Sequence, residues 1–148
     1  MKNLNTVEIL VKNLAEQSEI LVRNEKIGGY PDLIPKDKYS DNLVLKGEGV
    51  EVKSSKQKGG WQGHNPEEGW LIVFRYAIDI QTEPIENRDP TEIVEVLTAY
   101  LTHEDWSFSG RKGSSRRTIT ASITKNGMKK LRSNRVYLKQ ARSLDDFL

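Results

Sequence analysis

The sequence contains no cysteine and only two histidines, His64 and His103. Without cysteine the chain cannot form a disulfide, a cysteine-ligated zinc site or a cysteine nucleophile. Two histidines also disfavour a zinc site built mainly from histidine, including a histidine-based metal-finger nuclease around His64 and Asn65. No apolar run approaches the ~18 residues that a membrane helix needs. These absences exclude disulfide scaffolds, thiol enzymes and membrane-spanning helices.

The overall composition is that of a soluble protein with one domain. The 148 residues are 36% hydrophobic and 30% charged, which suits a single globular domain over residues 1–148. The first six residues lack the apolar stretch of a secretory signal. Together with the absence of cysteine, this predicts a cytoplasmic location.

Charge is distributed unevenly along the chain. Residues 106–144 contain eleven lysines and arginines and no acidic residue, which leaves 12 basic and 21 acidic residues in the rest of the chain. A basic C-terminal third of this kind predicts a polyanionic partner, and nucleic acid is the favoured one. The alternative is a basic face that only keeps the surface solvated.

Apolar spacing in the first half predicts one helix followed by strands. A capping box at Asn5 and helical periodicity predict a helix over residues 6–24, ended by two glycines. Asp32 then stands at the start of an extended segment over residues 30–35. Two short strands are expected over residues 42–45 and 50–53, joined by a turn that contains glycine. Residues 54–69 are polar and rich in glycine, which predicts a loop whose one large apolar residue, Trp61, needs a partner.

The second half of the sequence predicts a central strand and, in the basic C-terminal third, further strands. Nearly continuous apolar residues over 70–78 predict a strand covered on both faces. Asp89, Pro90 and Glu92 form a helix-start pattern, which predicts a second helix over residues 90–102. A strand is expected over residues 117–124, then a turn at Asn126-Gly127, a helical turn at 128–131 and a strand at 136–138. The fold class is therefore α/β, with a mixed β-sheet flanked by α-helices.

Two carboxylates and a lysine are expected to meet at one end of this sheet. Side chains alternate along a strand, so Glu51 and Lys53 share one face, while Asp32 opens a nearby strand. Carboxylate oxygens are the ligands that Mg²⁺ prefers, and a lysine beside them adds a positive charge. Such a group can polarise a phosphodiester and activate a bound water.

The same residues resemble a known family. The segment Tyr30-Pro31-Asp32-Leu33, followed by Glu51-Val52-Lys53 with eighteen residues between Asp32 and Glu51, resembles the PD-(D/E)XK nuclease superfamily, which includes most type II restriction endonucleases. The resemblance covers residues 30–56. It implies a restriction-endonuclease-like fold, Mg²⁺ bound by Asp32, Glu51 and the carbonyl of Val52, and Lys53 positioning the attacking water. Mn²⁺ is expected to substitute for Mg²⁺.

Other interpretations of these residues stay open. Glu51 and Lys53 could form an exposed ion pair of little energetic value. Asp41, just before a predicted strand, is a rival to Asp32 as the first acid. Glu16 or Glu19 on the first helix could lie near the metal, as a helix glutamate does in many members of the family, or could belong to a solvated helix face.

Polar and basic residues after Lys53 and in the C-terminal third are candidates for nucleic-acid contact. Lysine and arginine pair with phosphates, and hydroxyl, amide and imidazole groups bond to phosphates or base edges. Aromatic residues are few there, which favours duplex over single-stranded DNA. The candidates are Ser54, Ser55, Lys56, Lys58, Gln62, His64, Asn65, Arg111, Lys112, Arg116, Arg117, Lys129, Lys130 and Arg132.

The sequence thus predicts a Mg²⁺-dependent DNA endonuclease with Asp32, Glu51 and Lys53 as its catalytic residues. Its expected substrate is double-stranded or branched DNA, and a homodimer would place two sites across a duplex. The alternatives are a non-catalytic DNA-binding module of the same fold and a junction-resolving or repair nuclease, because a fold does not determine a function.

Overall fold

The computed structural model describes residues 5–26, 29–36, 48–63, 68–109 and 120–140. Within these ranges the chain forms a mixed α/β fold with two helices, α1 (Thr6–Gln17) and α2 (Lys125–Ser133). The strands are β1 (Leu21–Arg23), β2 (Leu33–Pro35), β3 (Val50–Ser55), β4 (Gln62–Gly63), β5 (Gly69–Ala77), β6 (Glu92–Leu101), β7 (Trp106–Ser109), β8 (Thr120–Ile123) and β9 (Arg135–Leu138). Neither described helix is long and apolar enough to cross a membrane.

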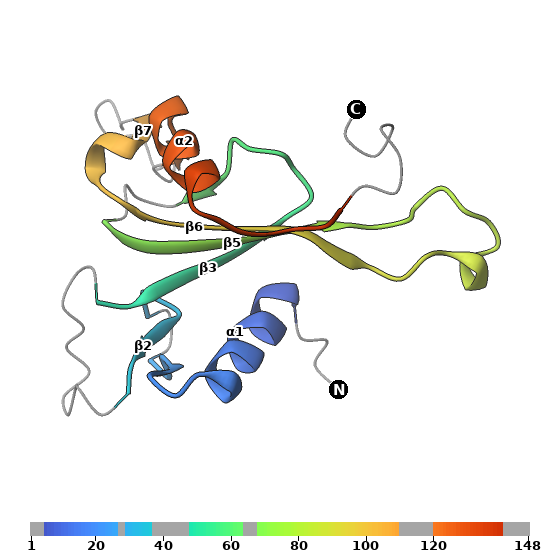
Figure 1. Cartoon of the computed structure of the whole chain (residues 1–148), viewed down its shortest axis with the longest axis horizontal. Coiled ribbons are helices and arrows are strands. Elements are labelled where there is room, and N and C mark those ends of the chain that lie inside the picture. Colours follow the sequence, from blue (N-terminus) through green and yellow to red (C-terminus); the bar gives the residue numbers. More distant parts are fainter. Residues whose placement is uncertain (1–4, 27–28, 37–47, 64–67, 110–119, 141–148) are drawn as a thin grey trace, which may run out of the picture.

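The main sheet has six strands in the order β1-β2-β3-β5-β6-β9, and it is mixed (Figure 1). Strands β1, β2 and β3 pair antiparallel, β3 and β5 pair parallel, and β5, β6 and β9 pair antiparallel again. The apolar run at 70–78 therefore forms a strand inside the sheet, as predicted. A second sheet, with the order β4-β8-β7, was not predicted.

The main sheet has two different faces, here called the α1 face and the α2 face. Register places Val52 beside Ile72 on the α1 face, and Lys53 beside Val73 on the α2 face. Helix α1 lies below the sheet in Figure 1, whereas α2 and β7 lie above it. The mixed sheet flanked by helices is therefore present, with one helix on each side.

Each face has its own apolar core. On the α1 face, Val11 packs with Leu33 and Val52 in a small core that also includes partly buried residues of α1 and β5. On the α2 face a larger core joins the main sheet to α2 and the second sheet. Its buried residues are Trp61, Leu71, Val73, Leu97, Ala99, Leu101, Trp106, Ala121, Ile123, Met128 and Leu131.

The first helix is shorter than the periodicity predicts. The capping box at Asn5 and Glu8 is present, but α1 ends at Gln17 instead of residue 24. The Ser18 hydroxyl accepts the backbone N–H groups of Ile20 and Leu21, which turns the chain into β1. The apolar residues after 20 therefore belong to the edge of the sheet, because pairing with β2 outweighs helical spacing.

The predicted helix over residues 90–102 is wrong, since this segment is strand β6. Pairing with β5 along its whole length buries Leu97, Ala99 and Leu101 on the α2 face and Val96 on the α1 face. Burial on both faces is typical of a strand inside a sheet. Asp89, which belongs to the helix-start pattern, has another role. The N–H of Asp89 donates to the carboxylate of Asp79 in the turn that precedes β6.

The predicted loop over residues 54–69 is partly wrong. Strand β3 continues to Ser55, and β4 pairs with β8. Trp61 does find its partner, because its ring lies in the larger core and its indole N–H donates to the carbonyl of Gln57. Asn126 and Gly127 lie in the first turn of α2, capped by Thr124, and not in a turn between elements.

Strands of the C-terminal half are confirmed where they are described. Strand β8 matches the end of the strand predicted over 117–124, and β9 matches the one predicted over 136–138. The strand predicted over residues 42–45 lies outside the described residues.

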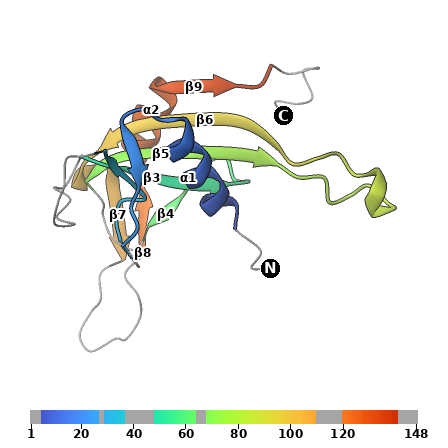
Figure 2. The same cartoon turned by 90° about the horizontal axis from the view of Figure 1, so that it is seen from below.

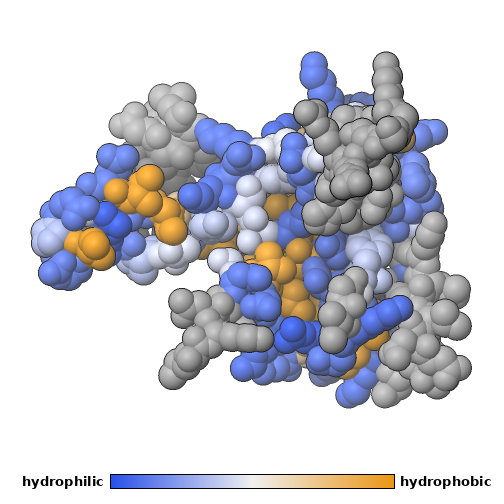
Figure 3. Space-filling model, turned by 180° about the vertical axis from the view of Figure 1, so that it is seen from behind, coloured by the Kyte–Doolittle hydropathy of each residue, from blue (hydrophilic) through white to orange (hydrophobic). Residues whose placement is uncertain are grey.

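The connection between β5 and β6 projects far beyond the sheet and is called the arm (residues 78–91). It extends to the right in Figure 1 and contains a short 3-10 turn, Ile85–Asn87. In Figure 3 hydrophobic side chains stand among hydrophilic ones on this projection. Hydrogen bonds from the side chain and backbone of Thr82, and from the N–H of Asp89, hold the pKa of the Asp79 carboxyl below its usual range.

A buried carboxylate, Asp105, joins α2 to the end of β6. It is 3% exposed, accepts the N–H and hydroxyl of Thr102, and pairs with Lys130 at 2.6 Å. Burial acts to raise the pKa of Asp105, but the hydrogen bonds from Lys130 and Thr102 and the charge of Lys130 outweigh it and keep that pKa below its usual value. Asp105 thus stays ionised inside the fold.

Replacing this carboxylate is expected to destabilise the protein in a pH-dependent way. At pH 7, Asp105→Ala should lower the free energy of unfolding by about 2–4 kcal/mol, because Thr102 and Lys130 lose their partner. A carboxyl with a lowered folded-state pKa stabilises above its unfolded pKa of about 3.9, and this contribution disappears as the pH falls through the folded value.

Denaturant unfolding between pH 7 and pH 2 tests this expectation. The difference between wild type and Asp105→Ala should shrink in acid. The exposed Asp89→Ala serves as the control and should change stability by about 0.5 kcal/mol or less. A difference for Asp105→Ala that stays constant down to pH 2 would contradict the assignment.

Candidate functional site

Asp32 lies where β2 meets β3. Leu33 pairs with Val50, and continuing this antiparallel register by one residue places Asp32 opposite Glu51. One oxygen of the Asp32 carboxylate, Oδ2, accepts the backbone N–H of Val52 at 2.9 Å. The aspartate is therefore fixed against the strand that carries Glu51 and Lys53, as the sequence predicts.

Gly49 permits the close approach of the Pro31–Leu33 segment to β3. Sequence reasoning had treated Gly49 only as part of a turn. A Cβ at Gly49 would lie 2.1 Å from Cγ of Pro31 and 2.4 Å from the carbonyl oxygen of Leu33. No side chain fits there unless β2 moves. The pattern Gly47-Glu48-Gly49 just before a strand was the available signal, because glycine in such a place often marks a close backbone approach.

Glu51 and Lys53 lie together on the α2 face of β3. The Lys53 Nζ is 3.8 Å from Oε1 of Glu51, and their side chains are only 18–19% exposed. They are therefore not the exposed surface pair of the alternative interpretation. Their neighbours in β5 on this face are Leu71 and Val73, both buried, so the two charges stand at the margin of the larger core.

Val52 contributes its backbone, while its side chain is buried on the α1 face. In an extended strand the N–H and C=O of one residue point to the same side. Because the N–H of Val52 points to Asp32, its carbonyl faces that side too. Asp32, the Val52 carbonyl and Glu51 thus supply three oxygen groups near one point of β3.

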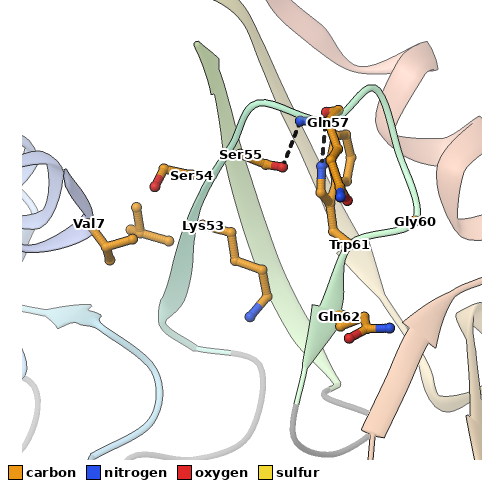
Figure 4. A pocket seen from close by; sticks show the side chains of 9 residues that line it. Val7, Lys53, Ser54, Ser55, Gln57, Gly60, Trp61 and Gln62 are labelled. Carbon is orange, nitrogen blue, oxygen red and sulfur yellow. Dashed lines mark hydrogen bonds between the residues drawn. The ribbon is translucent and has the colours of Figure 1, made fainter. Parts of the chain in front are cut away.

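A pocket of about 460 Å³ lies along β3 beyond the end of β2. Figure 4 shows Lys53 extending from β3 toward the side where Gln62 lies on β4, and the Trp61 side chain reaching toward Gln57. Strand β2 pairs with β3 only at Leu33 and Val50, so among the described residues no strand pairs with the outer edge of β3 next to this pocket. The residues that line it are Val7, Val52, Lys53, Ser54, Ser55, Gln57, Gly60, Trp61 and Gln62.

The donor groups at this site fit magnesium chemically. Mg²⁺ in proteins is usually held by one or two carboxylates, with water and substrate phosphates filling the other positions. Asp32 and Glu51 meet that requirement. In the part of the chain that the structure describes, no three His, Cys, Asp or Glu side chains come together as a metal-binding group. Among the described residues, the side chains that could hold a metal here are those of Asp32 and Glu51.

The polar residues after Lys53 have different surroundings. The Ser55 hydroxyl accepts the N–H of Gln57, which shapes the turn, and Ser54 is half-buried at the pocket. Lys56, Lys58 and Gln62 are exposed. Of this group, the two lysines and the glutamine are the ones placed to meet a partner.

Helix α2 brings its basic residues next to this loop. Lys129 is exposed, and the guanidinium of Arg132 donates to the carbonyl of Lys58 at 3.4 Å. A Cβ at Gly59 would lie 3.2 Å from Cε of Met128, so the loop packs directly on the helix. Lys130 is instead paired with Asp105.

The other candidates are not brought to the site or lie outside the described residues. Glu16 forms an exposed pair with Lys12 on α1, at 3.9 Å, and Glu19 is exposed as well. Since α1 covers the face opposite Glu51 and Lys53, these glutamates belong to a solvated helix surface. The candidates outside the described residues are Asp41, His64, Asn65, Arg111, Lys112, Arg116 and Arg117.

Comparison with family models, curated proteins and solved structures finds no match to this chain. The resemblance to PD-(D/E)XK nucleases therefore stays a prediction from the sequence motif alone.

Two substitutions test how Asp32 is held. Gly49→Ala should displace β2 and lower the free energy of unfolding by about 1–3 kcal/mol, the usual cost of overpacking. Both Gly49→Ala and Asp32→Ala should increase hydrogen exchange at the Val52 amide, which loses its acceptor. The Val73 amide, inside the sheet, serves as the internal control and should remain protected. Unchanged protection of Val52 in both variants would contradict the arrangement.

Proposed function

We propose that this protein is a Mg²⁺-dependent nuclease that hydrolyses phosphodiester bonds in DNA. The observation that carries the proposal is the convergence of Asp32, Glu51 and Lys53 at the open edge of β3. Two carboxylates and one lysine, mostly shielded from water beside a pocket, are a suitable set for phosphodiester hydrolysis. The PD-(D/E)XK family and its restriction-endonuclease-like fold are part of the same proposal.

Each of the three residues has a distinct role in this proposal. Asp32, fixed by the N–H of Val52, and Glu51 present oxygen ligands with little conformational freedom to lose. Lys53 places a positive charge 3.8 Å from Glu51, where it can orient a water molecule and interact with a phosphate. When bound, Mg²⁺ supplies Lewis acidity that polarises the phosphate and lowers the pKa of water, with the Val52 carbonyl as a further ligand.

A basic surface next to the site supports DNA as the substrate. Lys125, Lys129 and Arg132 are spaced at i, i+4 and i+7, so they share one exposed side of α2. Arg132 contacts the loop that carries Lys56 and Lys58, which follows directly from Lys53. Five positive charges thus extend from the pocket along α2, a pattern suited to the phosphates of a duplex.

A cleavage assay tests the proposal. Wild type incubated with supercoiled and linear plasmid should nick or cut DNA with Mg²⁺ or Mn²⁺ and not with EDTA. Asp32→Ala, Glu51→Ala and Lys53→Ala should each reduce the rate at least about 100-fold, because each removes a group that acts in the transition state. Lys12→Ala and Glu16→Ala, an exposed Lys/Glu pair on the opposite side of the sheet, are matched controls with unchanged rates.

The outcomes separate the candidate functions. Loss of cleavage in Asp41→Ala with retention in Asp32→Ala would contradict the assigned first acid. No cleavage by wild type, with DNA binding undiminished in all three site variants, would contradict the nuclease and favour a DNA-binding module. Cleavage restricted to branched substrates would favour a junction-resolving or repair nuclease over restriction.

The basic surface makes its own prediction. Lys58→Ala and Lys129→Ala should each weaken DNA binding and reduce the dependence of log Kd on log salt by about one unit per lost phosphate contact. Binding is measured by fluorescence anisotropy with a labelled duplex and Ca²⁺ between 50 and 200 mM salt. Lys36→Ala, an exposed lysine at the end of β2, is the control. Equal salt slopes for all variants would contradict the location of the DNA surface.

A further inference from the structure

The arm carries three exposed isoleucines. Ile80 and Ile85 are 61% and 67% exposed, and Ile78 is 43% exposed. Single exposed apolar side chains are common on soluble proteins. Three of them in a segment of eight residues are less easily explained without a partner. Figure 3 shows hydrophobic side chains among the hydrophilic ones of this projection.

The arm is also held in shape by its own hydrogen bonds. The Asp79 carboxylate accepts three backbone N–H groups, from Gln81, Thr82 and Asp89. The Arg88 guanidinium donates to the carbonyl of Thr82 and to the carboxylate of Glu83. A projection that is already ordered loses little conformational entropy when it binds.

A largely apolar hollow lies at the other end of the same two strands. A pocket of about 510 Å³ is lined by Trp70 and Tyr100, whose rings meet edge to face, and by Val136, which is 65% exposed. It adjoins a second, mainly apolar pocket of about 260 Å³, and Trp70 and Thr98 line both. Figure 2 shows the arm projecting from one end of β5 and β6.

The arm of the same molecule cannot fill this hollow. Trp70 pairs with Tyr100 at one end of the β5–β6 ladder, and Ala77 pairs with Glu92 at the other end, from which the arm projects. At about 3.3 Å per residue the two ends are roughly 23 Å apart. Figure 1 shows the arm directed away from the sheet. A second molecule is therefore needed to bring an arm to the hollow.

The charges of the arm and of the hollow indicate that the second molecule is another copy of this chain. The arm, residues 78–91, contains four acidic residues and one arginine, whereas residues 125–135 contain five lysines and arginines and no acid. Two of these basic residues, Lys130 and Arg135, line the hollow with side chains 46% and 37% exposed, and each is bound on its inner side, by Asp105 and Glu95. The acidic arm and the basic, apolar hollow of this chain are thus complementary to each other.

We propose that two copies of this chain form a homodimer by reciprocal exchange of their arms, each arm placing its isoleucines in the Trp70–Tyr100–Val136 hollow of the other copy. Because the exchange is reciprocal, the two contacts are identical and a two-fold axis closes the assembly. A stable interface buries about 1,200–2,000 Å² in total, so each of the two contacts needs to supply about half. This proposal does not depend on the nuclease function.

Sedimentation velocity over a range of concentrations tests the exchange on the full chain. Wild type should form dimers, and Ile85→Asp and Val136→Glu should each weaken self-association more than about tenfold, because each places a carboxylate in an apolar contact. Ile9→Asp is the matched control, since Ile9 is 45% exposed on α1 and lines neither of the two pockets. A monomeric wild type, or equal effects of all three substitutions, would overturn the proposal.

Cross-linking distinguishes arm exchange from other dimers. The chain contains no cysteine, so introduced thiols report on defined positions. A mixture of Ile85→Cys and Val136→Cys under mild oxidation should give a covalent dimer faster than either variant alone. Preferential cross-linking within Ile85→Cys alone would indicate contact between arms, and preferential cross-linking within Val136→Cys alone would indicate pairing of β9 edges. Either result would overturn the exchange.

Discussion

The hydrogen bond between the Asp32 carboxylate and the N–H of Val52 is the contact on which the site depends. It fixes the end of β2 to the middle of β3, at the point where regular pairing between these strands has stopped. Glu51 and Lys53 stand on either side of Val52, so the same bond brings both acids to one place. Gly49 makes the contact possible, because any side chain there would push the Pro31–Leu33 segment away.

The rest of the fold holds β3 in place along its other edge and on both of its faces. Parallel pairing with β5 holds β3 on its other side over six residues, and the two apolar cores cover both faces of this pair. Trp61 anchors the loop after β3 in the larger core, and Arg132 ties the same loop to α2. The pocket, the acids and the basic helix are therefore parts of one packed unit.

Sequence reasoning predicted the features that depend on residues close together in the chain, and it failed where residues far apart in the chain decide the structure. The shared face of Glu51 and Lys53 follows from the period of two in any strand, and the apolar run at 70–78 required burial on both faces. The helix expected over residues 90–102 failed because its start signal, Asp89 and Pro90, belongs to the arm. The apolar residues of this segment can also be buried in a strand when that strand pairs with β5.

Other features required knowledge of distant partners. Strand β4 has only two residues and becomes a strand only through β8, about sixty residues later, so its local sequence resembles a loop. Likewise, nothing near Gly49 in the sequence shows that Pro31 leaves no room for a side chain at position 49. The lowered pKa of Asp105 depends in part on Lys130, which follows 25 residues later in the sequence. Such effects belong to tertiary contacts and not to patterns along the chain.

The central claim is that Asp32 and Glu51 together hold a divalent metal at the open edge of β3. A titration with Mn²⁺, followed by paramagnetic broadening of backbone amide signals, tests it most directly. The amides of residues 32 and 51–53 should broaden first in wild type, at substoichiometric Mn²⁺, and should stay sharp in Asp32→Ala at the same concentration. First broadening on the acidic arm, or broadening at residues 51–53 that is the same in Asp32→Ala, would contradict the claim.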